Sequence, residues 1–215
     1  MKSKPVIIPL PKNPSITIKV IPGHFATTNV HVSHYIDMTE MKYSILAAKA
    51  VAKELAVPYL NRALVDTVVS MEGTEVIGAF LAQELSQDGI SVMNANRDIA
   101  ILTPMYNVNK QLTFPSNVRE QIRNRHVVLL MPSVSSGRAM RIARECIQYY
   151  GGHLAGISSL MNSNVTDLQD IHSVFHRTDI PEYQYYAAAD CAMCKAGIPL
   201  DAIISSVGYT TIQGP

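Results

Sequence analysis

Charge of one sign, cysteine and long apolar runs are all scarce in this sequence, and each scarcity excludes a class of protein. The 215 residues carry 18 lysines and arginines against 17 aspartates and glutamates, which gives a formal net charge of +1 at pH 7. A chain without an excess or a long run of basic residues lacks the electrostatic footprint of a nucleic-acid-binding protein. We therefore expect no nucleic acid among its partners.

Cysteine occurs only at Cys146, Cys191 and Cys194. Three cysteines do not form a disulfide framework, so we predict a reducing, cytoplasmic location. No apolar run approaches the ~18–20 residues of a membrane-spanning helix. Near the N-terminus the short apolar run is interrupted by four prolines, namely Pro5, Pro9, Pro11 and Pro14. We expect neither a signal peptide nor a membrane anchor.

Apolar residues are plentiful, at 47% of the chain. A chain of this length and composition is expected to bury roughly 70% of its unfolded surface, which excludes disorder as its main state. The length suits one large domain or one domain with a small appendage.

The pattern of apolar residues changes along the chain. Two alternating, β-branched segments over 16–21 and 30–36 predict strands, and apolar residues at helical spacing over 39–55 predict a helix. After residue 60, strands and helices alternate: strand 66–71, helix 75–85, strand 98–102, strand 126–131, helix 139–150 and strand 153–160. This order predicts an α/β fold with a central, mostly parallel twisted sheet flanked by helices.

These patterns suggest three regions. Residues 1–40 form N-terminal strands, residues 41–165 form the α/β core, and residues 166–215 form a C-terminal extension that packs on one of the other two.

The segment after the apolar strand 126–131 has the composition of a phosphate-binding loop. Ser135 and Ser136 offer hydroxyl groups, Gly137 allows close approach of a ligand, and Arg138 and Ala139 begin a helix. Backbone N–H groups and the positive end of a helix dipole favour an anion at such a turn. An ordinary strand-to-helix turn with a serine cap is the alternative interpretation, and both stay open. Neither GK[ST] nor G-x-G-x-x-G occurs.

Val127–Leu130 followed by the loop Ser135–Ala139 resembles the signature of type I phosphoribosyltransferases, and of orotate phosphoribosyltransferases in particular. In that family, four apolar residues precede an acidic pair, a short variable stretch and a Thr/Ser-Gly-Gly-Thr-like phosphate loop. Residues 23–38 are similar to the family's N-terminal hood segment, residues 65–75 to its pyrophosphate strand and loop, and residues 104–115 fall where it has a mobile active-site loop.

The resemblance implies a small hood built from N- and C-terminal segments, a homodimer, a phosphate-bearing small-molecule ligand and Mg²⁺. It also implies roles for residues of this chain. Those implied to bind phosphate or ribose are Ser133, Ser135, Ser136, Gly137, Arg138 and Ala139. Three further groups have implied roles. Glu72, Gly73 and Thr74 belong to the pyrophosphate loop, His34 and Tyr35 contact the nitrogenous base under the hood, and Lys110 lies in the mobile loop.

The chain departs from the family at the acidic pair, where Met131 and Pro132 stand. The family's carboxylates hold the ribose hydroxyls of the phosphoribosyl diphosphate donor, and Ser133 is the only nearby substitute. We therefore predict a degenerate donor site. Two functions stay open: a transferase that moves a phosphoribosyl group to a nitrogenous base, and a non-catalytic module that senses a nucleotide or sugar phosphate.

Cys191 and Cys194 form a single CxxC. A zinc site needs about four ligands, and no second CxxC and no later histidine follows, so other ligands would come from earlier segments or another subunit. Ordinary packing is the expected role, with metal binding and redox chemistry as alternatives. His31 and His34 point to opposite faces of a strand, so we expect no metal shared among His24, His31 and His34.

Overall fold

The computed structural model describes residues 4–27, 30–89, 92–163, 171–205 and 208–212. The chain forms two compact units. The larger unit is Lys42–Phe175, and the smaller unit combines Met1–Met41 with His176–Pro215. No helix within the described ranges is long and apolar enough to span a membrane.

A five-stranded sheet in the order β10-β9-β8-β4-β5 forms the centre of the larger unit. Its strands are β4 (Thr67–Ser70), β5 (Ala100–Leu102), β8 (His126–Val134), β9 (His153–Asn162) and β10 (Ile171–His176). The pairs β4–β5, β4–β8 and β8–β9 are all parallel, which confirms the predicted fold class. The unit extends to Phe175, beyond the expected limit at residue 165, because β10 belongs to this sheet.

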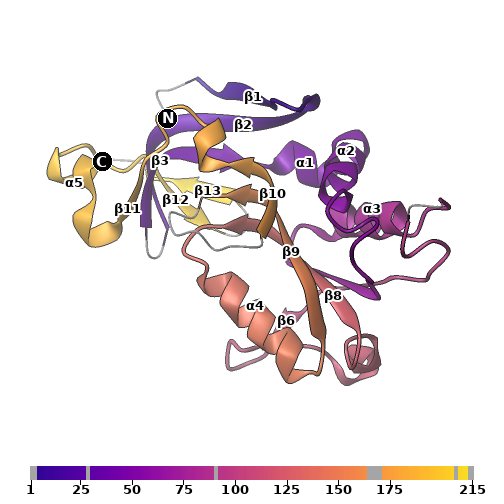
Figure 1. Ribbon diagram of the computed structural model, residues 1–215. Helices are drawn as coiled ribbons and strands as arrows, with labels where there is room; N and C mark the ends of the chain where they lie inside the picture. The colour runs from indigo at the N-terminus through magenta and orange to yellow at the C-terminus, as the bar shows by residue number, and fades with distance from the viewer. Residues whose placement is uncertain (1–3, 28–29, 90–91, 164–170, 206–207, 213–215) are drawn as a thin grey trace. The chain divides into compact units, whose positions relative to one another are not determined.

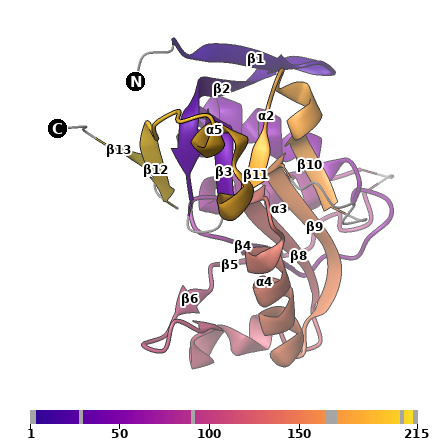
Figure 2. The same cartoon turned by 90° about the vertical axis from the view of Figure 1, so that its left-hand side faces the viewer.

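Helices cover both faces of this sheet, with α2 (Ile45–Ala56) and α3 (Glu75–Leu85) on one face and α4 (Arg138–Tyr149) on the other (Figures 1 and 2). The central strand β8 is accordingly buried on both sides over Val127–Met131, as its uninterrupted apolar run predicts. The predicted helix 39–55 is two helices, α1 (Thr39–Tyr43) and α2. They separate at Ser44, which has extended backbone and caps α2 by accepting a hydrogen bond from the Ala47 amide.

Residues 104–115, which fall where the resemblance puts a mobile loop, contain a short hairpin. It pairs β6 (Met105–Tyr106) with β7 (Leu112–Thr113), and a 3-10 helix follows over Ser116–Gln121.

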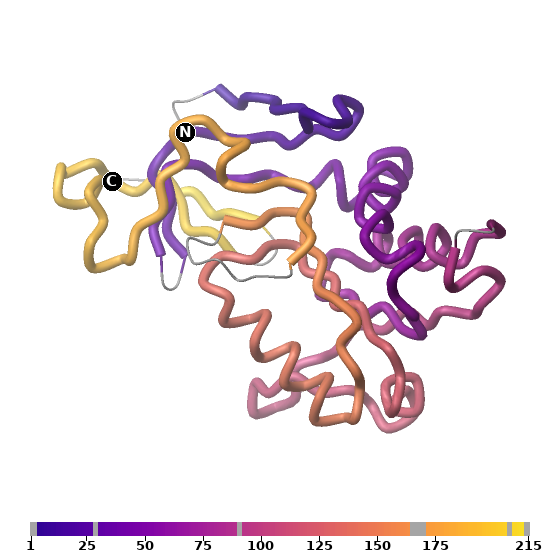
Figure 3. The backbone as a smooth tube through the Cα atoms, in the orientation of Figure 1, coloured from indigo at the N-terminus to yellow at the C-terminus, as the bar shows by residue number. Residues whose placement is uncertain are grey.

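Both ends of the chain build the sheet of the smaller unit, which has the order β11-β3-β2-β12-β13 with β1 paired to β2. Figure 3 shows the indigo and yellow segments running together here. The elements are β1 (Val6–Leu10), β2 (Asn13–Ala26), β3 (Val30–Asp37), β11 (Tyr185–Ala187), α5 (Ala192–Lys195), β12 (Ala202–Ser205) and β13 (Gly208–Thr211), with 3-10 turns at Arg177–Asp179 and Ala188–Asp190. The predicted N-terminal region and the part of the predicted C-terminal region from His176 onward therefore form one unit.

Candidate functional site

The loop between β8 and α4 is a tight bend that ends on a left-handed glycine. Gly137 has φ +73° and is the N-cap of α4, and its carbonyl accepts the first helical hydrogen bond from the Arg141 amide at 2.9 Å. Glycine adopts this conformation without strain. Ser135 is half-buried, whereas Ser136 and the side chain of Arg138 are exposed.

Four of the five backbone amides of Ser135–Ala139 have no hydrogen-bond partner among the described residues. Across the described part of the chain, no hydrogen bond joins the amides of Ser135, Ser136, Gly137 or Ala139 to a protein atom, and that of Arg138 reaches only Ser136 Oγ at 3.4 Å. The N-cap residue itself, Gly137, makes no side-chain hydrogen bond to α4. A serine hydroxyl therefore accepts from the first amide of α4, and the neighbouring amides of the loop are open donors at a helix N-terminus.

This loop lies where the strand order of the sheet reverses. From β4 the chain crosses through α3 to β5 on one side, and from β8 it crosses through α4 to β9 on the other. Ligands of open α/β sheets bind outside the carboxyl ends of strands at such a point. The loop after β4 reaches the same edge, because the Met71 amide donates to the Leu130 carbonyl at 2.9 Å.

The loop after β4, predicted to hold pyrophosphate, offers fewer groups than expected. Thr74 is fully buried, and both its amide and its hydroxyl donate to the Met71 carbonyl, at 3.0 and 2.7 Å. The Gly73 amide donates to the Glu75 carboxylate at 3.2 Å. Only Glu72 of the three predicted residues has an exposed side chain. Thr74 therefore supports the loop from inside.

A cation that the sequence did not single out lies against this loop. A Cβ atom built on Gly73 would be 3.2 Å from Lys42 Nζ, so the ammonium group packs directly over the glycine. Lys42 belongs to α1 and is about 30 residues away in sequence, without a motif that links it to the loop. Only the folded arrangement reveals it.

At the position of the family's acidic pair, the structure places apolar packing. Met131 is 3% exposed and belongs to an apolar cluster of the larger unit, while Pro132 is half-buried. The strand continues past them, with Ser133 and Val134 still paired to β9 and Ser133 exposed. This edge therefore lacks side-chain oxygen at residues 131 and 132.

The remaining predicted residues lie elsewhere. Lys110 is exposed in the turn of the β6–β7 hairpin. In the smaller unit, His34 stacks on Tyr183 with ring centroids 6.0 Å apart, and burial lowers its pKa. Tyr35 packs edge-on against Tyr209 at 4.7 Å, and burial raises its pKa. Their predicted role at a base remains a prediction.

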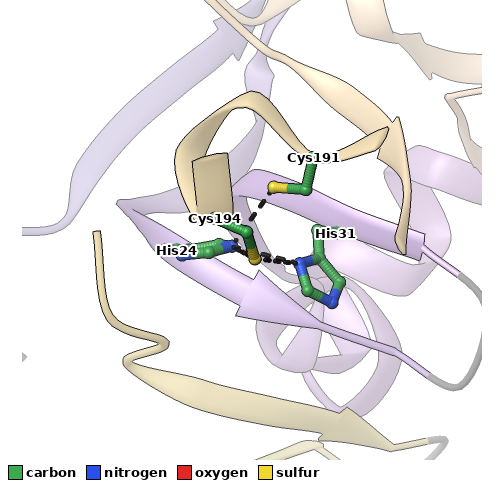
Figure 4. A group of neighbouring side chains, drawn as sticks. All are labelled: His24, His31, Cys191 and Cys194. Carbon is green, nitrogen blue, oxygen red and sulfur yellow. Dashed lines mark hydrogen bonds between the residues drawn. The ribbon is translucent and has the colours of Figure 1, made fainter. Parts of the chain in front are cut away.

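A second cluster lies wholly within the smaller unit, where His24, His31, Cys191 and Cys194 meet (Figure 4). From the sequence we expected no metal shared among His24, His31 and His34, but the structure brings the ring nitrogens of His24 and His31 within 3.2 Å of each other. Ala26 pairs with His31 across the β2–β3 hairpin, and His24 lies where the register of β2 shifts between Pro22 and Phe25. Its Nε2 faces His31 Nδ1 across the two strands. Burial lowers the pKa of His31, and the neighbouring His24 lowers it further.

Comparison of the amino-acid sequence with models of protein families and with curated proteins finds no match. Comparison of structures finds phosphoribosyltransferases. The adenine phosphoribosyltransferase of Thermoanaerobacter pseudethanolicus is 15% identical with a TM-score of 0.49, over 80% of this chain and 95% of that one. The orotate phosphoribosyltransferase of Mycobacterium tuberculosis, in complex with Fe(III) dicitrate, is 12% identical with a TM-score of 0.48, over 69% and 83%. The UMP synthase of Leishmania donovani is 16% identical with a TM-score of 0.49, over 68% and 30%. The likeness concerns the fold alone.

Proposed function

We propose that the chain binds the phosphate group of a nucleotide or sugar phosphate in the loop Ser135–Ala139. The observation that supports this most directly is the set of backbone amides in that loop without a protein partner. A buried or half-buried amide without a partner is costly, and an anion at the N-terminus of α4 would receive both these donors and the helix dipole.

The surrounding side chains favour a phosphate over a smaller anion. Ser135 and Ser136 add hydroxyl donors, and the exposed guanidinium of Arg138 suits a tetrahedral oxyanion. Ser133, exposed at the end of β8, is the side-chain oxygen available to a ribose next to the phosphate.

Phosphoribosyl transfer to a nitrogenous base is the second candidate function, and Lys42 favours it. Its ammonium group over Gly73 is placed at the loop where the resemblance puts pyrophosphate, a leaving group that gathers negative charge. Mg²⁺ would accompany the diphosphate, held chiefly by phosphate oxygens with Glu72 as the exposed carboxylate of this loop. Met131 and Pro132 weigh against efficient transfer, because they lack the carboxylates that hold the ribose in the family. Each tenfold in rate needs about 1.4 kcal/mol of transition-state stabilisation.

Thermal unfolding with added ligands tests the binding site. A nucleoside monophosphate or ribose 5-phosphate at about 100 times its Kd should stabilise the folded chain by about 2.7 kcal/mol. Ser136→Asp should abolish the shift, because it places a carboxylate among the donors. Gln148→Glu adds the same charge at the other end of α4 and should retain it. Equal shifts in both variants would refute the site.

Assays with phosphoribosyl diphosphate and Mg²⁺ separate the two functions. If the chain is a transferase, phosphoribosyl diphosphate should stabilise it, and Lys42→Ala should weaken this stabilisation. Orotate, uracil or a purine base should then be turned over. The binding module predicts stabilisation by the monophosphate alone and no turnover. Family-level turnover with any base would overturn the prediction of a degenerate donor site.

The family resemblance also supports a homodimer, and the scarcity of cysteine supports a cytoplasmic location. Light scattering on the purified chain should give about twice the 23.6 kDa of the monomer. A monomeric mass across the accessible concentration range would exclude the dimer.

A further inference from the structure

The cluster of two histidines and two cysteines in the smaller unit converges on one point. His24 Nε2 lies 3.2 Å from His31 Nδ1, 3.4 Å from Cys191 Sγ and 3.7 Å from Cys194 Sγ, and Cys194 Sγ lies 3.3 Å from His31 Nδ1. All four atoms fall within 4.8 Å of one another. Pairwise hydrogen bonds do not account for this arrangement, because a ring nitrogen has one lone pair and His24 Nε2 has three close neighbours.

These separations are those of ligands around a tetrahedral ion. Zinc lies about 2.0–2.1 Å from histidine nitrogen and about 2.3 Å from cysteine sulfur, so its four ligand atoms are about 3.3–3.8 Å apart. Four of the six separations, at 3.2–3.7 Å, are close to the edges of that tetrahedron, and all six are at most 4.8 Å. Figure 4 shows the side chains pointing toward a shared centre.

The residues around the cluster prepare His24 to bind a metal. Its Nδ1 is 2.9 Å from the Ile198 carbonyl, to which it donates, and this leaves the Nε2 lone pair directed at the cluster. Its backbone is held on both sides by Asp201, whose carboxylate accepts from the His24 amide and whose amide donates to the His24 carbonyl, each at 2.8 Å. His24 is fully buried at 1% exposure.

The two cysteines are presented by a short turn of the C-terminal segment. Cys191, 1% exposed, precedes α5, and Cys194 lies within it. Gly197, with φ +71°, then reverses the chain while its amide donates to the Cys194 carbonyl. This turn holds both sulfur atoms toward the β2–β3 hairpin.

We propose that His24, His31, Cys191 and Cys194 form a structural zinc site. Two thiolates and two imidazoles in a tetrahedron are a donor set that zinc favours. Four protein ligands leave no open position, so the metal serves the fold and does not activate water. The site joins residues of the N-terminal hairpin to residues about 160 positions later, and so ties the two chain segments of the smaller unit together.

Metal analysis of the intact chain, purified under reducing conditions, tests the proposal. Wild type should contain about one zinc per chain, and His31→Gln and Cys194→Ala should each lower zinc affinity at least about tenfold. Two matched controls should keep the metal: His34→Gln on the same strand, and Cys146→Ala, the third cysteine. Cobalt substituted for zinc should give the visible spectrum of a tetrahedral site with thiolate ligands.

A measurement on wild type keeps the test decisive if the variants fail to fold. Titration with a mercurial should release the zinc as two thiols react. Folded wild type without zinc, zinc retained by both ligand variants, or a Cys191–Cys194 disulfide in the reduced preparation would each overturn the proposal.

Discussion

Each of the two units of this protein is stabilised internally in a different way. The larger unit is continuous in sequence, and its central strands are buried on both faces. The smaller unit joins two distant segments through a three-residue pairing of β11 with β3 and a two-residue pairing of β12 with β2. In the apolar cluster that bridges these segments, the C-terminal side contributes the fully buried Ala202 and the partly buried Tyr183, Tyr185 and Ile204. The comparison teaches that two segments joined by such short strand pairings gain from a further link, which the zinc site would supply.

Removing the metal should have the largest effect on stability. It should destabilise the smaller unit and leave the larger unit folded. Structural zinc in small domains has apparent binding free energies of about 10–16 kcal/mol. We expect chelation to abolish the hydrogen-exchange protection of β3 and β12 while β4 and β8 stay protected. Equal loss of protection in both units would contradict their independent stabilisation.

Truncating a buried side chain should destabilise the larger unit. Leu129 is fully buried in β8, so Leu129→Ala should lower the free energy of unfolding in urea by about 2–5 kcal/mol. Leu46 is 81% exposed, and Leu46→Ala should change it by less than about 0.5 kcal/mol. Similar losses in both variants would show that burial is not the main source of stability here.

An ionic contact of the larger unit should make its stability pH-dependent. Burial alone would raise the pKa of Asp66, but hydrogen bonds from the His126 amide and imidazole, together with Arg97, outweigh it and lower the pKa. A lowered carboxyl pKa stabilises the fold above the unfolded value of about 3.9, and this contribution is lost as the pH falls through the folded value.

Asp66→Asn should therefore cost about 1.5–3 kcal/mol at pH 7 in urea unfolding, and less below pH 4. Glu120→Gln, which breaks an exposed ion pair with Arg123, should cost at most about 1 kcal/mol. A loss for Asp66→Asn that is the same at pH 3 and pH 7 would exclude the charge as its cause.

The smallest effect concerns two hydroxyls on the same buried strand. Within the described residues, Ser70 Oγ is buried without a hydrogen-bond partner, whereas Thr67 Oγ1 donates to the Gln121 carbonyl. Ser70→Ala should leave the melting temperature unchanged or slightly raised, and Thr67→Val should lower it by the equivalent of about 1 kcal/mol. The reverse order would show that the Ser70 hydroxyl contributes to stability.

Local patterns in the sequence determined much of the fold. The predicted helix 75–85 is α3 with the same bounds, because its apolar residues repeat at helical spacing and nothing interrupts them. The apolar run at 126–131 was predicted as a strand of a mostly parallel sheet, and in the structure it pairs in parallel with both of its neighbours. The break at Ser44 was missed, because a local cap ends a helical pattern that the apolar residues alone would continue.

The proposed phosphate loop could be predicted from the sequence because Ser135–Ala139 is contiguous, and a few neighbouring residues would set its chemistry. Lys42 over Gly73, and His24 beside Cys191, were decided only by the tertiary structure. The physical reason is that spacing along the chain reports neighbours within one strand or helix, whereas these contacts depend on how separate elements pack and on which face a strand presents.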